Sequence, residues 1–88
     1  MLPYNYSESF KKILKKLYKK DKTTYKRLLN KIKEISKSEN IEHYKNLRKP
    51  LQHLKRSQIG EKVLVFRYDK KNKLVSFENF KHHDQIYQ

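Results

Sequence analysis

The chain of 88 residues carries 23 lysines and arginines against 9 aspartates and glutamates, which gives a formal net charge of +14. This length predicts one domain, residues 1–88, with a modest hydrophobic core. The absence of cysteine excludes disulfide bonds and a thiolate zinc site, and a single glycine excludes a glycine-rich phosphate-binding loop.

A charge excess of this size indicates an anionic partner, with nucleic acid, an acidic protein and a membrane surface as the candidates. The first ten residues lack the basic and apolar regions of a signal peptide. No apolar window approaches the roughly 20 residues that a transmembrane helix needs. We therefore expect a cytoplasmic protein, and no membrane partner, because the apolar stripe of the first helix is needed to cover a sheet.

The first third of the chain predicts a short strand and two amphipathic helices. Residues 4–6 favour an edge strand, and Ser7 is a good N-cap for a first helix. Asp21 is a second N-cap, for a helix that runs to about Ser36, so the two helices should form an antiparallel hairpin. Their apolar stripes are Phe10, Ile13, Leu14, Leu17 and Tyr18, and then Tyr25, Leu28, Leu29, Ile32 and Ile35.

A polar loop over residues 36–49 precedes three predicted strands. The loop has room for one helical turn near Ile41. Strands follow at about 54–59, 63–68 and 74–80, with turns at Gly60 and at residues 69–72. The predicted fold class is α+β, in the order β-α-α-β-β-β. A small antiparallel sheet of about four strands packs on the N-terminal two-helix hairpin, and its other face is left to solvent or a ligand.

Acid–base catalysis by paired carboxylates and a Ser-His-Asp triad both lack support in this sequence. The carboxylates are scattered over turns and strand ends, and no nucleophile elbow surrounds a serine. The run His82-His83-Asp84 contains metal-ligand residue types. Adjacent histidines on a strand point to opposite faces, however, so we expect no metal site and no other cofactor.

The remaining candidates are cationic and aromatic, which is typical of RNA binding. Arginine and lysine neutralise phosphates, and aromatic or histidine rings stack on unpaired bases. Attack by an RNA 2′-hydroxyl needs a proton acceptor, cations around the phosphorane and a proton donor for the leaving oxygen. Simpler roles stay open: the helix lysines as a solvated face, Lys55 and Arg56 as edge-protecting charges, and Tyr87 as a contact that packs the tail.

The order of elements and three segments resemble the RelE/ParE superfamily of type II toxins. These segments are KPLQHLKRSQIG, KVLVFRYDKK and the closing FKHHDQIY. The resemblance implies a RelE fold and an acidic RelB-like antitoxin partner that forms an oligomer with the toxin. For the RelE branch it also implies metal-independent cleavage of mRNA on the ribosome. The alternatives are a ParE-like gyrase inhibitor without nuclease activity and a non-enzymatic module that binds RNA or the ribosome.

The resemblance carries roles onto individual positions. The basic pair before the family glycine falls at His53 and Lys55, with Arg56 beside them, and the central-strand arginine is missing, with Lys62 nearest. Lysine cannot bind phosphate in arginine's bidentate manner, so Lys62 departs from the family pattern at this position. The predicted catalytic residues are Lys55, Lys81, His83 and Tyr87, and the predicted RNA-binding residues are His53, Arg56, Lys62, Arg67 and His82.

Overall fold

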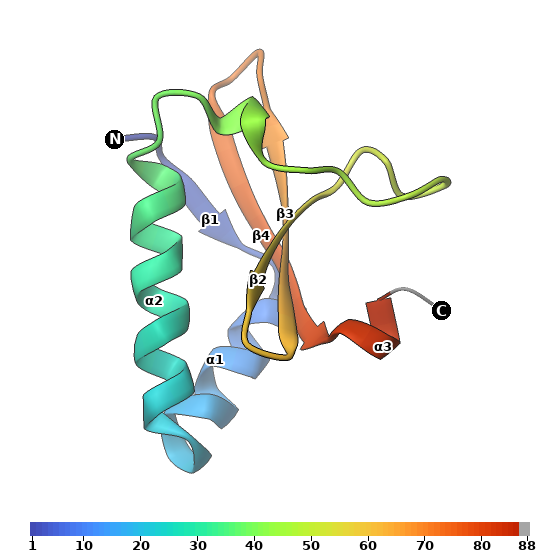
Figure 1. Ribbon diagram of the computed structural model, residues 1–88. Helices are drawn as coiled ribbons and strands as arrows, with labels where there is room; N and C mark the ends of the chain where they lie inside the picture. The colour runs from blue at the N-terminus through green and yellow to red at the C-terminus, as the bar shows by residue number, and fades with distance from the viewer. Residues whose placement is uncertain (87–88) are drawn as a thin grey trace.

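A computed structural model describes residues 1–86 and contains a four-stranded sheet with helices on one face (Figure 1). The strand order across the sheet is β1-β4-β3-β2. The elements are β1 (Tyr4–Tyr6), α1 (Glu8–Lys20), α2 (Lys22–Ser36), a 3-10 turn η1 (Ile41–His43), β2 (Lys55–Ile59), β3 (Lys62–Asp69), β4 (Leu74–His82) and α3 (His83–Ile86). This architecture confirms the predicted α+β class and its element order through β4.

One pairing in the sheet differs from the antiparallel sheet that the sequence predicted. Strands β2, β3 and β4 form an antiparallel meander, but β1 pairs with β4 in parallel, so the sheet is mixed. The reason is topological: the helical hairpin carries the chain from one edge of the sheet to the other before the meander begins. That crossover, which is longer than a turn, permits a parallel neighbour.

Both predicted N-caps are present and fix where the helices begin. The Ser7 hydroxyl accepts a hydrogen bond from the Phe10 amide at 3.1 Å and donates one to the Glu78 carbonyl at 2.8 Å. The Asp21 carboxylate accepts from the Thr24 amide at 3.1 Å, directly after α1 ends. Ser7 therefore caps α1 and also ties it to β4, while one residue separates the two helices.

The main core lies between the helices and one face of the sheet. Helical spacing brings Phe10 and Leu28 to this face, and strand alternation brings Phe66 and Phe77 to it. The rings of Phe10 and Phe77 stack with centroids 6.0 Å apart. The buried members of this core are Phe10, Leu17, Leu28, Ile32, Ile35, Ile41, Ile59, Leu64, Phe66, Val75, Phe77 and Phe80.

The opposite face of the sheet is partly covered by the segment 44–54, rather than left wholly open. Figure 1 shows this segment reaching away from the body before it returns as β2. Asn46 pairs with Lys55 as an isolated antiparallel bridge, and the Arg56 amide donates to the Lys45 carbonyl at 2.9 Å. A second, smaller core results, in which Leu47 packs on Val63 and Val65.

The single glycine makes the tight turn between β2 and β3. Ile59 pairs with Lys62, so Gly60 and Glu61 form a two-residue hairpin loop, and Gly60 has a φ of +63°. A side chain at this position would be strained, because only glycine adopts positive φ without cost. Within residues 1–86, no helix has the length and apolar character needed to span a membrane.

Candidate functional site

A cationic concavity lies against β2 on the sheet face that the helices leave free. Its volume is about 590 Å³, and we call it the arginine groove. Its lining residues come from three separate segments: the 44–54 segment, β2 and the start of α3. They are Asn46, Arg48, Arg56, Gln58 and His83. Two guanidinium groups and one imidazole therefore share a hollow with two amide side chains, all of them able to donate hydrogen bonds to an anion.

Strand register places Arg56 in the groove. Arg56 pairs with Val65, and paired residues of an antiparallel ladder project to the same face. Val65 belongs to the small core under Leu47, away from the helices. Arg48 reaches the same side because the backbone bridge between Asn46 and Lys55 holds its loop along the edge of β2.

The tight turn at Gly60 positions His83. The carbonyl of Glu61 lies 3.0 Å from the His83 amide, which donates to it, and 3.1 Å from the His83 ring nitrogen Nδ1. A carbonyl only accepts, so this contact places the proton on Nδ1. Nε2 is left facing the Asp84 carboxylate, whose Oδ1 is 3.0 Å away. The turn thus fixes both the position and the tautomer of the groove's histidine.

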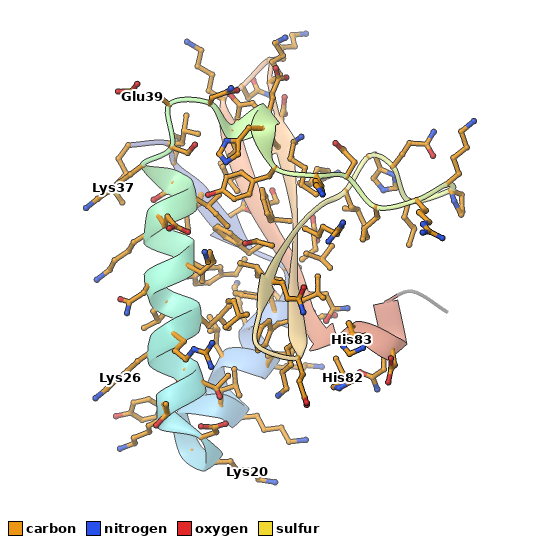
Figure 2. All side chains as sticks on the ribbon, viewed as in Figure 1. Lys20, Lys26, Lys37, Glu39, His82 and His83 are labelled. Atoms are coloured by element: carbon orange, nitrogen blue, oxygen red, sulfur yellow. The ribbon has the colours of Figure 1, made fainter. Side chains whose placement is uncertain are left out.

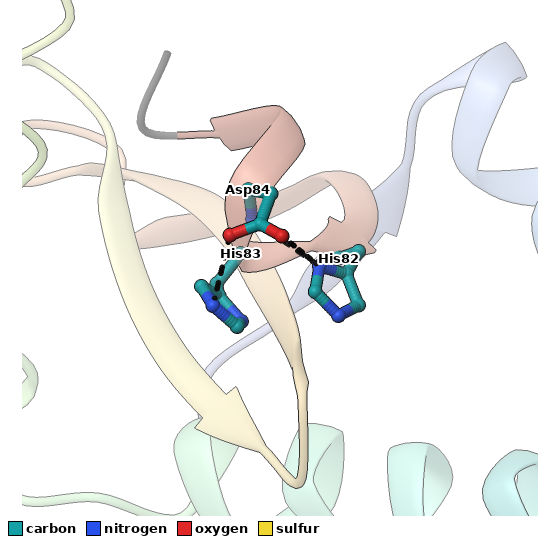
Figure 3. A group of neighbouring side chains, drawn as sticks. All are labelled: His82, His83 and Asp84. Atoms are coloured by element: carbon teal, nitrogen blue, oxygen red, sulfur yellow. Dashed lines mark hydrogen bonds and ion pairs between the residues drawn. The ribbon is translucent and has the colours of Figure 1, made fainter.

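His82 and His83 lie together, contrary to the prediction that they point to opposite faces of a strand. Strand β4 ends at His82 and helix α3 begins at His83, so the period-two alternation breaks between them. Their rings stack with centroids 4.4 Å apart, and the Asp84 carboxylate lies between them (Figure 3). The His82 Nδ1 atom is 3.5 Å from Asp84 Oδ2. We call His82, His83 and Asp84 the histidine cluster; these three residue types can hold a metal ion.

Lys55, a predicted catalytic residue, is buried on the helix side of the sheet. Its partner across the ladder is Phe66, a member of the main core, and only 9% of Lys55 is exposed. Its ammonium donates to the Tyr44 carbonyl at 3.2 Å and to the Asn46 side-chain oxygen at 3.3 Å. This geometry favours a role in anchoring the 44–54 segment and leaves Arg56 as the groove residue of the pair.

Two predicted RNA-binding residues lie away from the arginine groove. Lys62 alternates with Leu64 and Phe66 on the helix side, and its ammonium lies over the Phe80 ring, 5.5 Å from the ring centre. Arg67 is on the free face, two residues along β3 from Val65, the partner of Arg56, but it does not line the groove. Arg67 forms an ion pair of 3.6 Å with Glu78.

The other predicted residues have mixed placements. Lys81 pairs with Val63 on the free face and lines a smaller hollow of about 250 Å³ beside Leu47. His53 is exposed in the turn before β2. Tyr87 lies outside the described residues. The arginine groove therefore brings together Arg56 and His83 from the predicted set, with His82 stacked beside them.

Sequence reasoning missed Arg48, Asn46 and Gln58. The polar segment that holds Arg48 and Asn46 was interpreted as a plain loop. Arginine scarcity was a usable signal, because only 4 of the 23 basic residues are arginines, and 2 of these 4 line the groove. By contrast, Lys26 on α2 and Lys37 just after its end extend away from the sheet (Figure 2).

Sequence comparison links the chain to small toxins. It is 51% identical over 80 residues, which cover 90% of this chain and 83% of the relative, to a protein of Methanocaldococcus jannaschii named "Putative toxin RelE4". An uncharacterized protein of Methanosarcina mazei is 45% identical over 73 residues, covering 82% of this chain and 83% of that protein. No family model matches the chain.

Structural comparison finds the same fold in two solved toxins. A metal-bound toxin from Helicobacter pylori superposes with a TM-score of 0.66 at 24% identity, covering 98% of this chain and 99% of that one. The toxin–antitoxin complex RelBE2 from Mycobacterium tuberculosis gives a TM-score of 0.62 at 19% identity, covering 92% and 90%. The fold is thus that of small α+β toxins. With the 51% identical relative, the chain belongs to the RelE toxin family, which confirms the resemblance.

Proposed function

We propose that this chain is the toxin of a toxin–antitoxin pair and that it cleaves mRNA on the ribosome at the arginine groove. The observation that carries this proposal is the convergence of Arg48, Arg56 and His83 in one hollow. Membership of the RelE toxin family supports the toxin role. The three side chains supply the two kinds of group that RNA cleavage by an internal 2′-hydroxyl requires, which are cations and a proton carrier.

The two arginines bind and stabilise the scissile phosphate. A guanidinium offers two parallel N–H donors to phosphate oxygens, a geometry that a lysine ammonium cannot supply. The negative charge on these oxygens grows as the 2′-oxygen adds to phosphorus, so fixed cations act most strongly in the transition state. The net charge of +14 attracts the RNA backbone over a longer range.

His83 carries the proton in this mechanism. As the 2′-oxygen bonds to phosphorus, the bond to the 5′-oxygen breaks, and the products are a 2′,3′-cyclic phosphate and a 5′-hydroxyl. One proton leaves the 2′-hydroxyl and one must reach the 5′-oxygen. The His83 Nε2 atom is suited to exchange it, because Nδ1 is held by the Glu61 carbonyl. Lys81, on the same face, adds positive charge nearby, and a part for Tyr87 stays a prediction.

An acidic antitoxin is the partner that the charge distribution favours. The structural neighbour from Mycobacterium tuberculosis is a toxin–antitoxin complex, which supports a bound antitoxin here. Lysines cover the outer sides of both helices, and an acidic chain lying on them would relieve their mutual repulsion. We propose that the two proteins form a cytoplasmic complex in which the toxin is inactive.

Induced expression followed by primer extension on an abundant message tests the nuclease activity. Wild-type protein should arrest growth and produce discrete cleavage ends. The Arg56→Ala variant should lower cleavage about 100-fold, the usual effect of losing one transition-state donor. Arg67→Ala is the matched control, because it removes the same charge from the same face outside the groove. His83→Ala should abolish cleavage.

Two other outcomes would replace the nuclease proposal. Growth arrest with intact message contradicts it, and inhibition of supercoiling by purified gyrase would then identify a gyrase inhibitor. RNA binding that weakens steeply with salt, without any cleavage, would identify a binding module. Co-expression of the reading frame beside the gene tests the partner, since an antitoxin restores growth and co-purifies with the toxin.

A further inference from the structure

The histidine cluster places several hydrogen-bond acceptors against one another at the end of β4. One ligand atom from each of His82, His83 and Asp84 lies within 4.8 Å of the other two. The His83 Nε2 atom faces Asp84 Oδ1 at 3.0 Å, and His82 Nδ1 faces Asp84 Oδ2 at 3.5 Å (Figure 3). A carboxylate bears only acceptors, so neutral rings that face it with lone pairs need a cation between them and the carboxylate.

The hydrogen bonds of the two rings assign those lone pairs in the neutral imidazoles. The His83 Nδ1 atom donates to the Glu61 carbonyl at 3.1 Å, so in the neutral ring the lone pair is on Nε2. The His82 Nδ1 atom accepts from the Asp84 amide at 3.3 Å, so its lone pair also lies on the Asp84 side. A bound ion would displace that long hydrogen bond. In their neutral forms, both imidazoles therefore present a lone-pair nitrogen toward the same carboxylate.

Glu61 supplies the outer contacts that metal-binding histidines usually have. Such a histidine donates its second ring nitrogen to a carboxylate or a backbone carbonyl, which fixes the ring and strengthens the ligand. The Glu61 carbonyl fills this role for His83, and the Glu61 carboxylate lies 3.6 Å from the His82 Nε2 atom. One turn residue thus faces the outer nitrogen of each ring, and its charge with that of Asp84 offsets the neighbouring lysines.

We propose that the histidine cluster binds one zinc ion through His82 Nδ1, His83 Nε2 and the Asp84 carboxylate. Two imidazoles and a carboxylate match the three protein ligands of open zinc sites, with water in the remaining position. Zinc bonds of about 2.0–2.2 Å separate neighbouring ligand atoms by roughly 3.4 Å. The nitrogen–oxygen separations of 3.0 and 3.5 Å are close to this value. The two rings are stacked with planes 29° apart, so they must rotate to aim both nitrogens at one ion.

Zinc at this position would remove the groove's proton carrier. Nε2 of His83 is the atom assigned to proton transfer, and a metal-bound nitrogen has no free lone pair. The ion therefore inhibits cleavage while leaving Arg48 and Arg56 in place to bind RNA. This inhibitory effect rests on the proposed function, whereas the binding of zinc does not.

Competition between the full chain and a chromophoric zinc chelator measures binding directly. The protein is purified without a histidine tag, so that its four histidines are the only ones present. Wild type should bind one equivalent of zinc. His82→Gln and Asp84→Asn should each weaken binding at least tenfold, and Glu61→Gln should weaken it less, because its carbonyl remains. The variant His43→Gln, which alters a histidine outside the cluster and outside the predicted RNA-binding set, is the matched control and should bind as wild type does.

The outcomes separate this inference from the nuclease proposal. Unchanged zinc affinity in folded His82→Gln and Asp84→Asn variants, or loss of binding in the control, would overturn the site; circular dichroism establishes that each variant is folded. Stoichiometric binding by a chain that never cleaves RNA would leave the zinc site standing and refute the nuclease. If the chain cleaves, zinc should inhibit wild type and the control variant equally, at concentrations that match the binding curve.

Discussion

The two faces of the sheet use the same strands for different purposes. The helix side carries Phe66 and Phe77 in a continuous core with α1 and α2. The other side buries Val63 and Val65 under one loop leucine, and arginines and a histidine remain accessible beside them. The helix side therefore supplies most of the apolar burial that stabilises the fold. The small apolar cluster on the free side holds the 44–54 segment against the sheet beside the groove.

The two faces should differ most in how much stability is lost when a buried core residue on each face is replaced by alanine. Phe77→Ala removes a fully buried ring from the helix side and should lower the free energy of unfolding by about 3–5 kcal/mol. Leu47→Ala on the free side should cost about 2 kcal/mol, the low end for such a change, because the loop can relax. Urea unfolding measures both. Equal losses would contradict the division between the faces.

Neighbouring positions on β2 sharpen the same comparison. Lys55→Met leaves the Tyr44 carbonyl and the Asn46 amide oxygen without their donor, so we expect a loss of about 1–3 kcal/mol in unfolding free energy. Arg56→Met should instead weaken RNA binding. It should also reduce the slope of log K for RNA binding against log salt concentration by about one. Unfolding curves and filter-binding titrations on both variants check this, and RNA binding lost only in Lys55→Met would reverse the assignment.

The turn between β2 and β3 links stability to the groove. Gly60→Ala forces a side chain into positive φ and should lower the free energy of unfolding by about 1–2 kcal/mol. Because the next residue, Glu61, holds His83, cleavage should fall by more than the folded fraction does. Single-turnover cleavage of folded protein provides the measurement. A variant with full activity would show that the turn does not position the histidine.

The smallest expected effect is a pH dependence at the helix hairpin, remote from the groove. Hydrogen bonds from the Thr24 hydroxyl and amide lower the pKa of the Asp21 carboxyl from its usual 3.8. A lowered folded-state pKa contributes stability above the unfolded pKa, and this contribution is lost as pH falls through the folded value. Asp21→Ala should therefore reduce the melting temperature at pH 7, and this difference should narrow below about pH 4. A constant difference would contradict the assignment.

The local patterns of the sequence were sufficient for the fold class and for the order of elements through β4. Ser7 and Asp21 cap the helices where expected, and Gly60 makes the predicted turn. The parallel pairing of β1 with β4 was not predictable from Tyr4–Tyr6, because the sequence of a three-residue strand does not specify which strand it pairs with or in which direction. Pairing direction depends on the path of the helical hairpin, which no local pattern records.

The candidate site was harder to predict, because it depends on which face each residue occupies. Arg56 and His83 were predicted and lie in the groove. Lys55 and Lys62 were also predicted, but strand alternation turns both toward the helices. A shift of one residue along a strand exchanges the two faces, so composition and approximate position do not determine which side a residue occupies.

The parallel pairing of β1 with β4 has a consequence for synthesis of the protein. The ribosome makes residues 4–6 long before residues 74–82, and Ser7 bonds to Glu78, 71 residues away. The first strand therefore has no partner strand until residues 74–82 have been translated. His83 follows β4 directly, so the groove is completed only after these residues. Under the proposed nuclease function, a growing chain would therefore spare the ribosome that makes it until β4 and His83 have been made and folded.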